Sequence, residues 1–196
     1  MYAQITAMDL NKIVHRIRFF IITPAKEWEK ITHEKATNKD LVLTYIAPVV
    51  LFSSLVIFAG RILNWEDHSV VNGALAVLSF LLIAFSTIYL SAFIINELLP
   101  KFGVVKNLNH AFKLIIFSSL PALIAFGISS FHPQTGFINY FSLYSIILYW
   151  KGVKPLLSIE EVKITGFVLI SLLIIGALLL IISSVIMSVI IYFSVY

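Results

Sequence analysis

Two ionisable residues lie at the edges of neighbouring apolar stretches and are the first candidates for chemistry. Glu97 closes one stretch, and Lys113 lies about one helical turn inside the next. If these apolar stretches lie in a membrane, ionisable groups at their edges are costly unless they are paired or used by the protein. We expect an ion pair between Glu97 and Lys113 that holds two helices together, and a proton or ion pathway is the alternative.

Further polar residues extend this candidate intramembrane site. Pro121 removes a backbone N–H from the middle of the stretch that Lys113 enters. A broken helix frees carbonyls that can coordinate cations in transporters, but we expect a kink that serves packing. The full candidate set is Asn96, Glu97, Lys113, Ser118, Ser119 and Pro121.

No residue pattern specifies a catalytic, metal or cofactor site. The chain has no cysteine, and its histidines form no i, i+4 pair: His15, His33, His68, His110 and His132. Ser118 and Ser119 lack a Gly-x-Ser-x-Gly context, and serines in membrane helices commonly bond to the backbone or let helices approach. No phosphate-binding GxxxxGK[ST] motif occurs. We therefore expect no catalytic residue, no metal and no cofactor, and we expect that the chain is not an enzyme.

The composition predicts a membrane protein. Of 196 residues, 60% are hydrophobic and 12% are charged, against about 45–50% and about 25% in soluble domains. A bilayer accepts an apolar exterior, whereas a water-soluble globule of this size needs polar surface. The net charge of +4 comes from the first forty residues and the short loops, so we expect no nucleic-acid partner.

Hydropathy predicts an all-α integral membrane bundle of five transmembrane helices in residues 41–196, preceded by a cytoplasmic or interfacial region in residues 1–40. The first span, at about 1.5 Å per residue, is roughly 33 Å long. The fourth is only marginally long and could instead be re-entrant, whereas the fifth is longer than one bilayer requires. The predicted spans are about 41–62, 70–95, 112–130, 137–150 and 164–190.

An amphipathic helix is predicted near the N-terminus, over residues 8–22. Lys12, Arg16 and Arg18 fall mostly opposite its apolar residues. Such cations suit anionic headgroups, although a helix that packs on protein has the same periodicity. Trp28, on a second short helix over 25–36, is expected at headgroup level. These four residues are the predicted membrane-surface contacts.

The distribution of cations predicts the orientation of the chain. Lys and Arg in short loops favour the cytoplasmic side, and with five spans nearly all of them share one side. Arg61 alone falls opposite, beside Glu66 and Asp67. We therefore expect a cytoplasmic N-terminus and an external C-terminus.

Aromatic residues mark the fourth predicted span. Tyr140 and Tyr144 lie four residues apart, on one helical face. An interfacial aromatic belt is the first interpretation. The alternative is a groove for a lipid or a partner, made with Gly152.

Three stretches resemble a known family. INELLPKFGVVKNLNHAFKLIIFSSLP, with its Asn96–Glu97 pair, Gly103 and Pro121, is similar to bacterial Yip-one domain proteins, which have five spans. YSIILYWKGVKPLLSIEEVKITGF and ITPAKEWEKI are also similar to this family, so the resemblance covers about residues 21–190.

The resemblance implies that the protein binds partners at a membrane, and it assigns no catalytic reaction. Eukaryotic members lie in Golgi and endoplasmic-reticulum membranes, bind Rab-type GTPases and act in vesicle formation, but their long N-terminal region and Asp-Leu-Tyr-Gly motif are absent here. We expect a bacterial-type scaffold or adaptor of the inner membrane that binds lipids, membrane proteins or a second copy of itself. The alternative is a small ion or solute transporter or channel that uses Glu97, Lys113 and the Pro121 helix.

Overall fold

The computed structural model describes residues 15, 16, 18–20, 22–64 and 69–195. Residues 15, 16, 18–20 and 22 are helical. The later elements are α2 (Pro24–His33), α3 (Asn38–Leu41), the π-helix η1 (Val42–Ile46), α4 (Ala47–Asn64), α5 (Val70–Leu98), the 3₁₀-helix η2 (Leu99–Phe102), α6 (Leu108–Ser129), the 3₁₀-helix η3 (Pro133–Leu143), α7 (Tyr144–Leu157) and α8 (Glu161–Val195). The described part of the chain contains no strand, so the all-α prediction is confirmed.

Side-chain caps fix where the first and third long helices begin. The Thr37 hydroxyl accepts a hydrogen bond from the Asp40 N–H at 3.2 Å, and the Asp40 carboxylate accepts one from the Thr37 N–H at 3.1 Å. This reciprocal capping box satisfies N–H groups that have no partner inside the helix. At the start of α6, the Asn107 side chain accepts from the His110 N–H at 3.1 Å. Both helices therefore begin at polar residues rather than within the apolar stretch.

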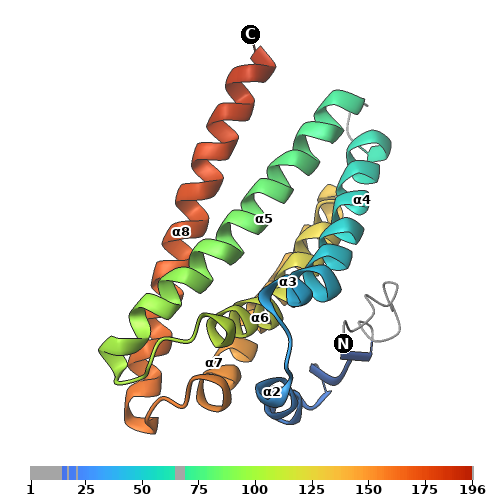
Figure 1. Cartoon of the computed structure of the whole chain (residues 1–196). Coiled ribbons are helices and arrows are strands. Elements are labelled where there is room, and N and C mark those ends of the chain that lie inside the picture. Colours follow the sequence, from blue (N-terminus) through green and yellow to red (C-terminus); the bar gives the residue numbers. More distant parts are fainter. Residues whose placement is uncertain (1–14, 17, 21, 65–68, 196) are drawn as a thin grey trace, which may run out of the picture.

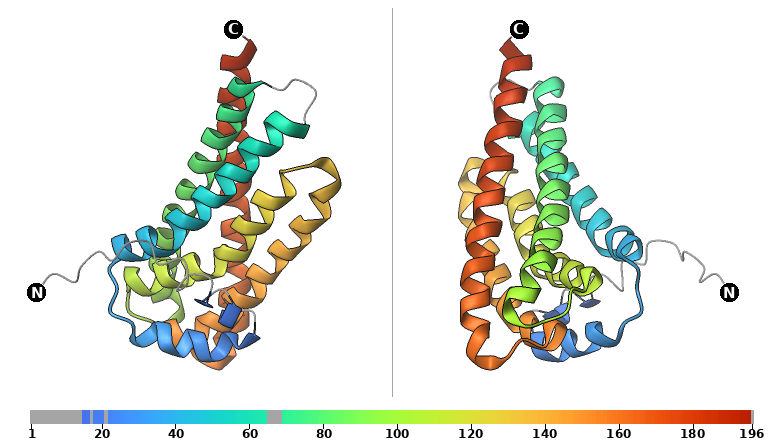
Figure 2. Two further views of the ribbon diagram at one scale, coloured as in Figure 1. Left: turned by 90° about the vertical axis from the view of Figure 1, so that its right-hand side faces the viewer. Right: turned by 60° about the vertical axis from the view of Figure 1, so that its left-hand side comes forward.

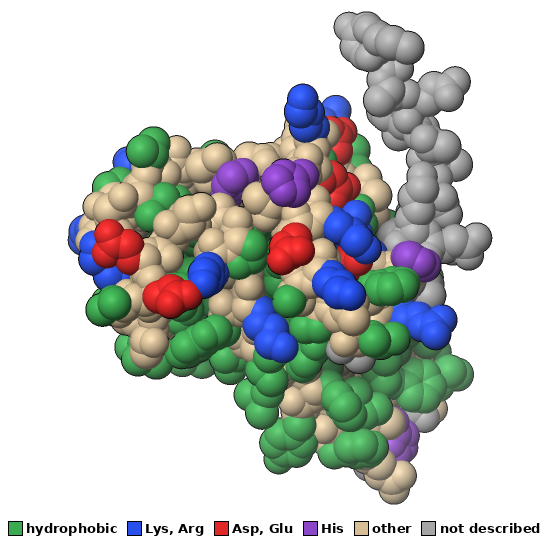
Figure 3. All heavy atoms as spheres, turned by 90° about the horizontal axis from the view of Figure 1, so that it is seen from below, with side chains coloured by type: hydrophobic (Ala, Val, Ile, Leu, Met, Phe, Trp, Pro, Cys, Tyr) green, Lys and Arg blue, Asp and Glu red, His purple; other side chains and the backbone are tan. Residues whose placement is uncertain are grey.

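The long helices alternate in direction (Figures 1 and 2). α4, α6 and α8 run away from the end where α2 lies, while α5 and the η3–α7 segment run back toward it. α2 lies across this end of the bundle, and α8 ends at the opposite end. Figure 3 looks at the end of the bundle where α2 lies and shows Lys, Arg, Asp and Glu side chains gathered there.

Within the described residues, four helical segments are long and apolar enough to cross a membrane: Asn38–Leu63, Val70–Phe102, Leu108–Ser129 and Glu161–Tyr192. The last is the least covered by protein, with 6% of its most apolar window buried. Leu173 and Leu180 on α8 are 74% and 70% exposed. Large exposed apolar surfaces of this kind are rare on soluble monomers, so hydrocarbon is the natural environment of this helix.

The fourth predicted span has a mixed structure. Its first part is η3, and only from Tyr144 does the chain form an α-helix. It is not among the four long apolar helical segments, and the number of five spans stays a prediction. The segment runs back along α6 (Figure 2), and the Ser145 hydroxyl accepts a hydrogen bond from the Ala122 N–H at 3.1 Å.

α4 and α6 approach each other most closely around Gly127. A Cβ atom at this position would lie 2.6 Å from the Cβ and Oγ atoms of Ser53. The Ser53 hydroxyl uses this proximity to donate a hydrogen bond to the Leu123 carbonyl at 3.0 Å. Small residues serve this purpose in membrane helices, where packing replaces the hydrophobic effect as the driving force.

Replacing Gly127 with leucine should destabilise the fold, because the new side chain has no space between α4 and α6. We expect a loss of about 1–3 kcal/mol in the free energy of unfolding, as is typical of overpacking. Thermal unfolding of the detergent-solubilised protein measures it. Gly176→Leu is the matched control, since nothing lies within 4 Å of a Cβ built there. Equal melting temperatures of the two variants would contradict this packing.

Candidate functional site

Trp28 anchors α2 against the end of the bundle. The indole is fully buried, with 0% of the residue exposed. It fills the space over Gly152 of α7, where an added Cβ would lie 2.7 Å from the indole and from Leu114. Gly152 therefore leaves room for a tryptophan from a helix more than a hundred residues earlier in the chain.

An aromatic cluster surrounds this anchor. The Phe20 ring contacts Trp28 at 5.1 Å and Phe117 at 5.5 Å between centroids, and Tyr45 contacts Phe117 at 4.8 Å. The Arg16 guanidinium lies over the Tyr45 and Phe117 rings, at 5.2 and 5.5 Å from their centroids. Such cation–π contacts gain strength where water is excluded, so Arg16 joins the N-terminal helical residues to α6.

Lys113 makes the second connection between α2 and the bundle. Its residue is 2% exposed, and Nζ donates to the Ile31 carbonyl at 3.0 Å and to the Glu34 carbonyl at 2.7 Å. These carbonyls belong to the last turn and C-cap of α2. The C-terminal end of a helix carries partial negative charge and unsatisfied carbonyls. Lys113 therefore caps α2 from a different helix.

Two carboxylates on the same side of α2 are neutralised locally. Arg16 Nη1 donates to Glu34 Oε2 at 2.8 Å, and Arg16 Nε lies 3.9 Å from Glu27 Oε2. Lys30 Nζ donates to Glu27 Oε1 at 2.5 Å. Glu27 is only 4% exposed, and a carboxylate removed from water requires such partners.

A polar cavity opens beside this junction, between the α2–α3 loop and the first turns of α6. Its volume is about 490 Å³, and its lining residues are Thr32, His33, Glu34, Lys35, Ala36, Thr37, Asn109, His110 and Lys113. Asn109 Nδ2 donates to the Ala36 carbonyl at 2.9 Å and to Asn38 Oδ1 at 2.8 Å, which fixes the loop over α6. Sequence patterns gave no sign of this cavity, because its residues are separated by seventy positions.

The expected ion pair between Glu97 and Lys113 is not formed. Glu97 pairs instead with Lys106 in the following loop, and Lys113 donates to the carbonyls of α2. The order of the residues in the sequence favoured a partner from the adjacent span. It could not show that the end of α2 packs against Lys113 in the folded chain. Asn96, the neighbour of Glu97, is buried.

The two serines and Pro121 take structural positions. Ser118 Oγ donates to the Leu114 carbonyl at 2.6 Å, and Ser119 Oγ donates to the Ile116 carbonyl at 2.9 Å. Pro121 lies inside α6 without ending the helix. The Ala122 N–H, next to it, is bonded to the Ser145 hydroxyl. The Ser145 side chain therefore satisfies a backbone N–H beside the proline, as side chains do in other membrane helices.

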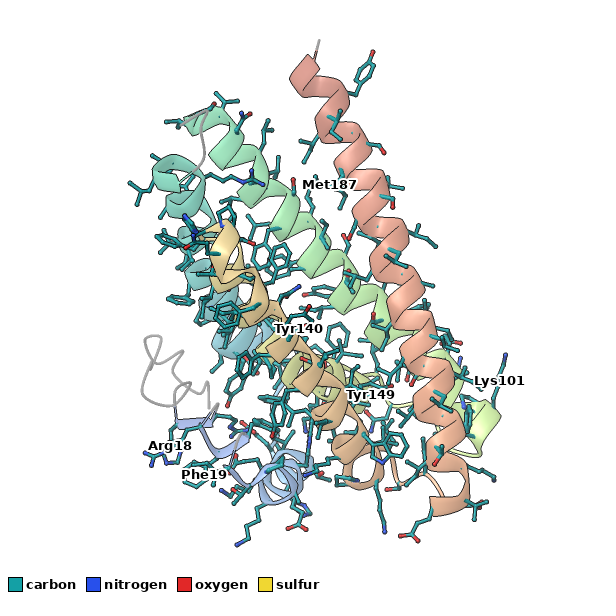
Figure 4. The ribbon with its side chains drawn as sticks, turned by 180° about the vertical axis from the view of Figure 1, so that it is seen from behind. Arg18, Phe19, Lys101, Tyr140, Tyr149 and Met187 are labelled. Carbon is teal, nitrogen blue, oxygen red and sulfur yellow. The ribbon has the colours of Figure 1, made fainter. Side chains whose placement is uncertain are left out.

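Tyr140, Tyr144 and Gly152 do not share an open groove. Tyr140 is 74% exposed on η3, and Figure 4 places it farther from α2 than Tyr149. The Tyr144 hydroxyl donates to the Phe20 carbonyl at 3.0 Å. Gly152 is covered by Trp28. A partner or lipid could reach Tyr140 but not Gly152.

The predicted membrane-surface residues divide into two groups. Arg18 is exposed, and Figure 4 shows it at the outer edge of the α2 end. Arg16 and Trp28 instead turn toward protein, because the aromatic cluster and Glu34 supply their contacts. Lys12 lies outside the described residues. Helical periodicity marks an apolar face but cannot distinguish lipid from protein as its partner.

No metal site emerges from the described residues, since no three His, Asp or Glu side chains converge there. His33 and His110 also line the polar cavity, and the His110 imidazole is hydrogen-bonded to the Leu156 backbone. The arrangement can therefore hold polar or anionic groups through hydrogen bonds and charge.

Comparison with known proteins agrees with this architecture. No curated protein and no solved structure matches the chain significantly. The Yip1 domain matches residues 18–193, which include α2, α4, α5, α6, α7 and nearly all of α8, together with Trp28 and Lys113. This match covers nearly the whole chain, and a protein with several membrane-spanning helices is what the four apolar segments indicate. The chain is a membrane protein that belongs to the Yip1 domain family.

Proposed function

We propose that this protein is a non-enzymatic five-span scaffold or adaptor of a bacterial cytoplasmic membrane, which binds membrane proteins or lipids at its cytoplasmic end. The docked N-terminal region is the observation that carries the proposal. Residues around Arg16, Trp28 and Lys113 form a structured, charged platform at one end of the bundle. A platform of this kind suits recognition of a partner at the membrane surface, with Lys12 and Arg18 as proposed contacts to anionic headgroups.

Non-enzymatic action is favoured by how the polar residues are used. Lys113 and the hydroxyls of Ser118 and Ser119 donate to backbone carbonyls, and Glu97 is paired at the surface with Lys106. The groups that would serve acid–base chemistry or ion passage are thus engaged in holding helices and caps together.

Five crossings are supported by the geometry of the fourth segment. The 3₁₀-helix η3 has 11 residues and rises about 2.0 Å per residue, whereas an α-helix rises about 1.5 Å. η3 is therefore about 22 Å long and the 14 residues of α7 about 21 Å. Together they exceed the hydrocarbon core, which is about 30 Å thick. The segment has the reach of a full crossing because it extends beyond residues 137–150 at both ends.

The cytoplasmic position of the α2 end is supported by the distribution of cations. Arg18 and Lys101 lie in the half of the molecule near α2 in Figure 4, and Met187 lies in the other half. With five crossings, the loop of Lys106 and the last turn of α7, which carries Lys154, return to the same end. This agrees with the preference of Lys and Arg for cytoplasmic loops.

A small transporter remains the second candidate because of polar atoms on α5. Ser91 Oγ and Asn96 Oδ1 are buried without a hydrogen-bond partner in the described part of the chain. Buried polar atoms inside a membrane are costly unless water or a solute satisfies them. A solute path would pass beside these two residues rather than through Glu97.

Single-cysteine labelling tests the five crossings, and the chain offers a background without any cysteine. We expect an impermeant maleimide added to intact cells to label Gln134→Cys, because its loop would be external. Lys106→Cys and Lys154→Cys should react only after the membrane is opened. Labelling of Lys154→Cys in intact cells would show that residues 133–157 do not cross.

Affinity capture from gently solubilised membranes tests the adaptor role. We expect a protein or lipid to be enriched above an unrelated five-span control, and expect the enrichment to fall when Gly152→Leu displaces Trp28 and α2. Gly136→Leu is the matched control, since nothing lies within 4 Å of a Cβ at Gly136. Enrichment equal to that of the unrelated protein would count against an adaptor.

A further inference from the structure

The polar cavity beside α2 carries more positive than negative charge. Its charged side chains are Lys35, Lys113 and Glu34, and His33 adds a further hydrogen-bonding group, whereas the His110 imidazole is engaged with the Leu156 backbone. The Glu34 carboxylate is already engaged, with Oε2 accepting from Arg16 at 2.8 Å and Oε1 accepting from the Tyr45 hydroxyl at 3.4 Å. Glu34 therefore contributes little free negative charge to the cavity.

Lys113 gives the cavity a fixed cation. An ammonium group has three donors, and the Ile31 and Glu34 carbonyls accept two hydrogen bonds from Lys113 Nζ. These two contacts hold the group in place, and Lys113 is 98% buried yet lines the cavity. A preorganised ammonium of this kind costs little entropy when it meets an anion, unlike a mobile surface lysine.

We propose that this cavity binds a phosphate group, carried either by an anionic phospholipid or by a small phosphorylated solute. Phosphate oxygens accept several charge-assisted hydrogen bonds at once, which matches the ammonium groups of Lys35 and Lys113 and the imidazole of His33. A neutral ligand would bring no counter-charge to the two ammonium groups, and the Glu34 carboxylate near Lys113 is already paired with Arg16. The volume of about 490 Å³ is sufficient for a phosphate with part of its headgroup.

The place of the cavity in the fold favours the lipid as the source of phosphate. α3 and α6 both begin at its rim, so it lies where two apolar segments leave the polar end. Leu43 and Leu108, on these same segments, are 48% and 38% exposed. A headgroup held in the cavity would leave its acyl chains beside apolar helix surface.

This inference rests on the proposed membrane placement and names a ligand for the cytoplasmic end. It predicts a property of the purified chain alone, which requires no protein partner. If phosphate does not bind but affinity capture succeeds, the phosphate site is rejected and the adaptor role is kept. If phosphate binds but affinity capture fails, the phosphate site is kept and the adaptor role is rejected.

The test uses the full chain in phosphatidylcholine nanodiscs. Native mass spectrometry measures how much phosphatidic acid is retained when it is offered against phosphatidylcholine, and inorganic phosphate and glycerol 3-phosphate are added in separate arms. We expect Lys35→Gln to weaken retention about three- to tenfold, the loss of one charge-assisted hydrogen bond. Lys39→Gln, an exposed cation of the next turn that does not line the cavity, should change it by less than about twofold.

Each outcome decides between the possibilities. Retention that depends on Lys35 and resists glycerol 3-phosphate assigns the site to a lipid headgroup, and displacement by either soluble phosphate assigns it to a solute. Lys113→Met should abolish binding in both cases. If that variant unfolds, Lys35→Gln still decides, because the Lys35 side chain is exposed. No preference for phosphatidic acid, or equal effects of Lys35→Gln and Lys39→Gln, would overturn the proposal.

Discussion

One buried ammonium group determines how the polar end of this protein is built. Lys113 is 2% exposed, and a charge removed from water must be matched by hydrogen bonds or an opposite charge. In this fold the match comes from the Ile31 and Glu34 carbonyls at the end of α2, and Glu34 adds its carboxylate nearby. The cation needs α2, and the end of α2 needs a donor, so the N-terminal region and the bundle satisfy each other.

The rest of the polar end follows from this docking. Once α2 lies across the bundle, Trp28 meets the open face of Gly152, and Arg16 reaches both Glu34 and the Phe117 ring. The loop after α2 lies over α6, and the open cavity that we assign to a phosphate group lies between them. The proposed partner-binding surface and the proposed headgroup cavity would then both depend on the docking of α2, which suits an adaptor of the Yip1 domain family.

The sequence predicted the elements whose signal is local and missed those that depend on distant contacts. Long apolar stretches identified the helices that contain α4, α5, α6 and α8, because hydropathy alone requires them to be helical in a bilayer. The fourth segment was ambiguous, since the apolar residues 137–150 alone are too short for a full crossing, and the helical segment extends beyond them at both ends. The partner of Lys113 was missed because a helix eighty residues away supplies it. Trp28 was expected in headgroups, yet the glycine that makes room for it, Gly152, is visible only in three dimensions.

The docking of α2 by Lys113 is tested most directly by a distance measurement in a bilayer. Spin labels at the exposed residues Glu29 and Lys151 report the separation of α2 and α7, and Lys113→Met removes the ammonium while keeping an unbranched side chain. The account predicts one narrow distance population in the native background, which Lys113→Met broadens and lengthens. Lys106→Met, which removes an exposed cation, should leave it unchanged. A broad population in the native background, or a narrow one that survives Lys113→Met, would contradict the account.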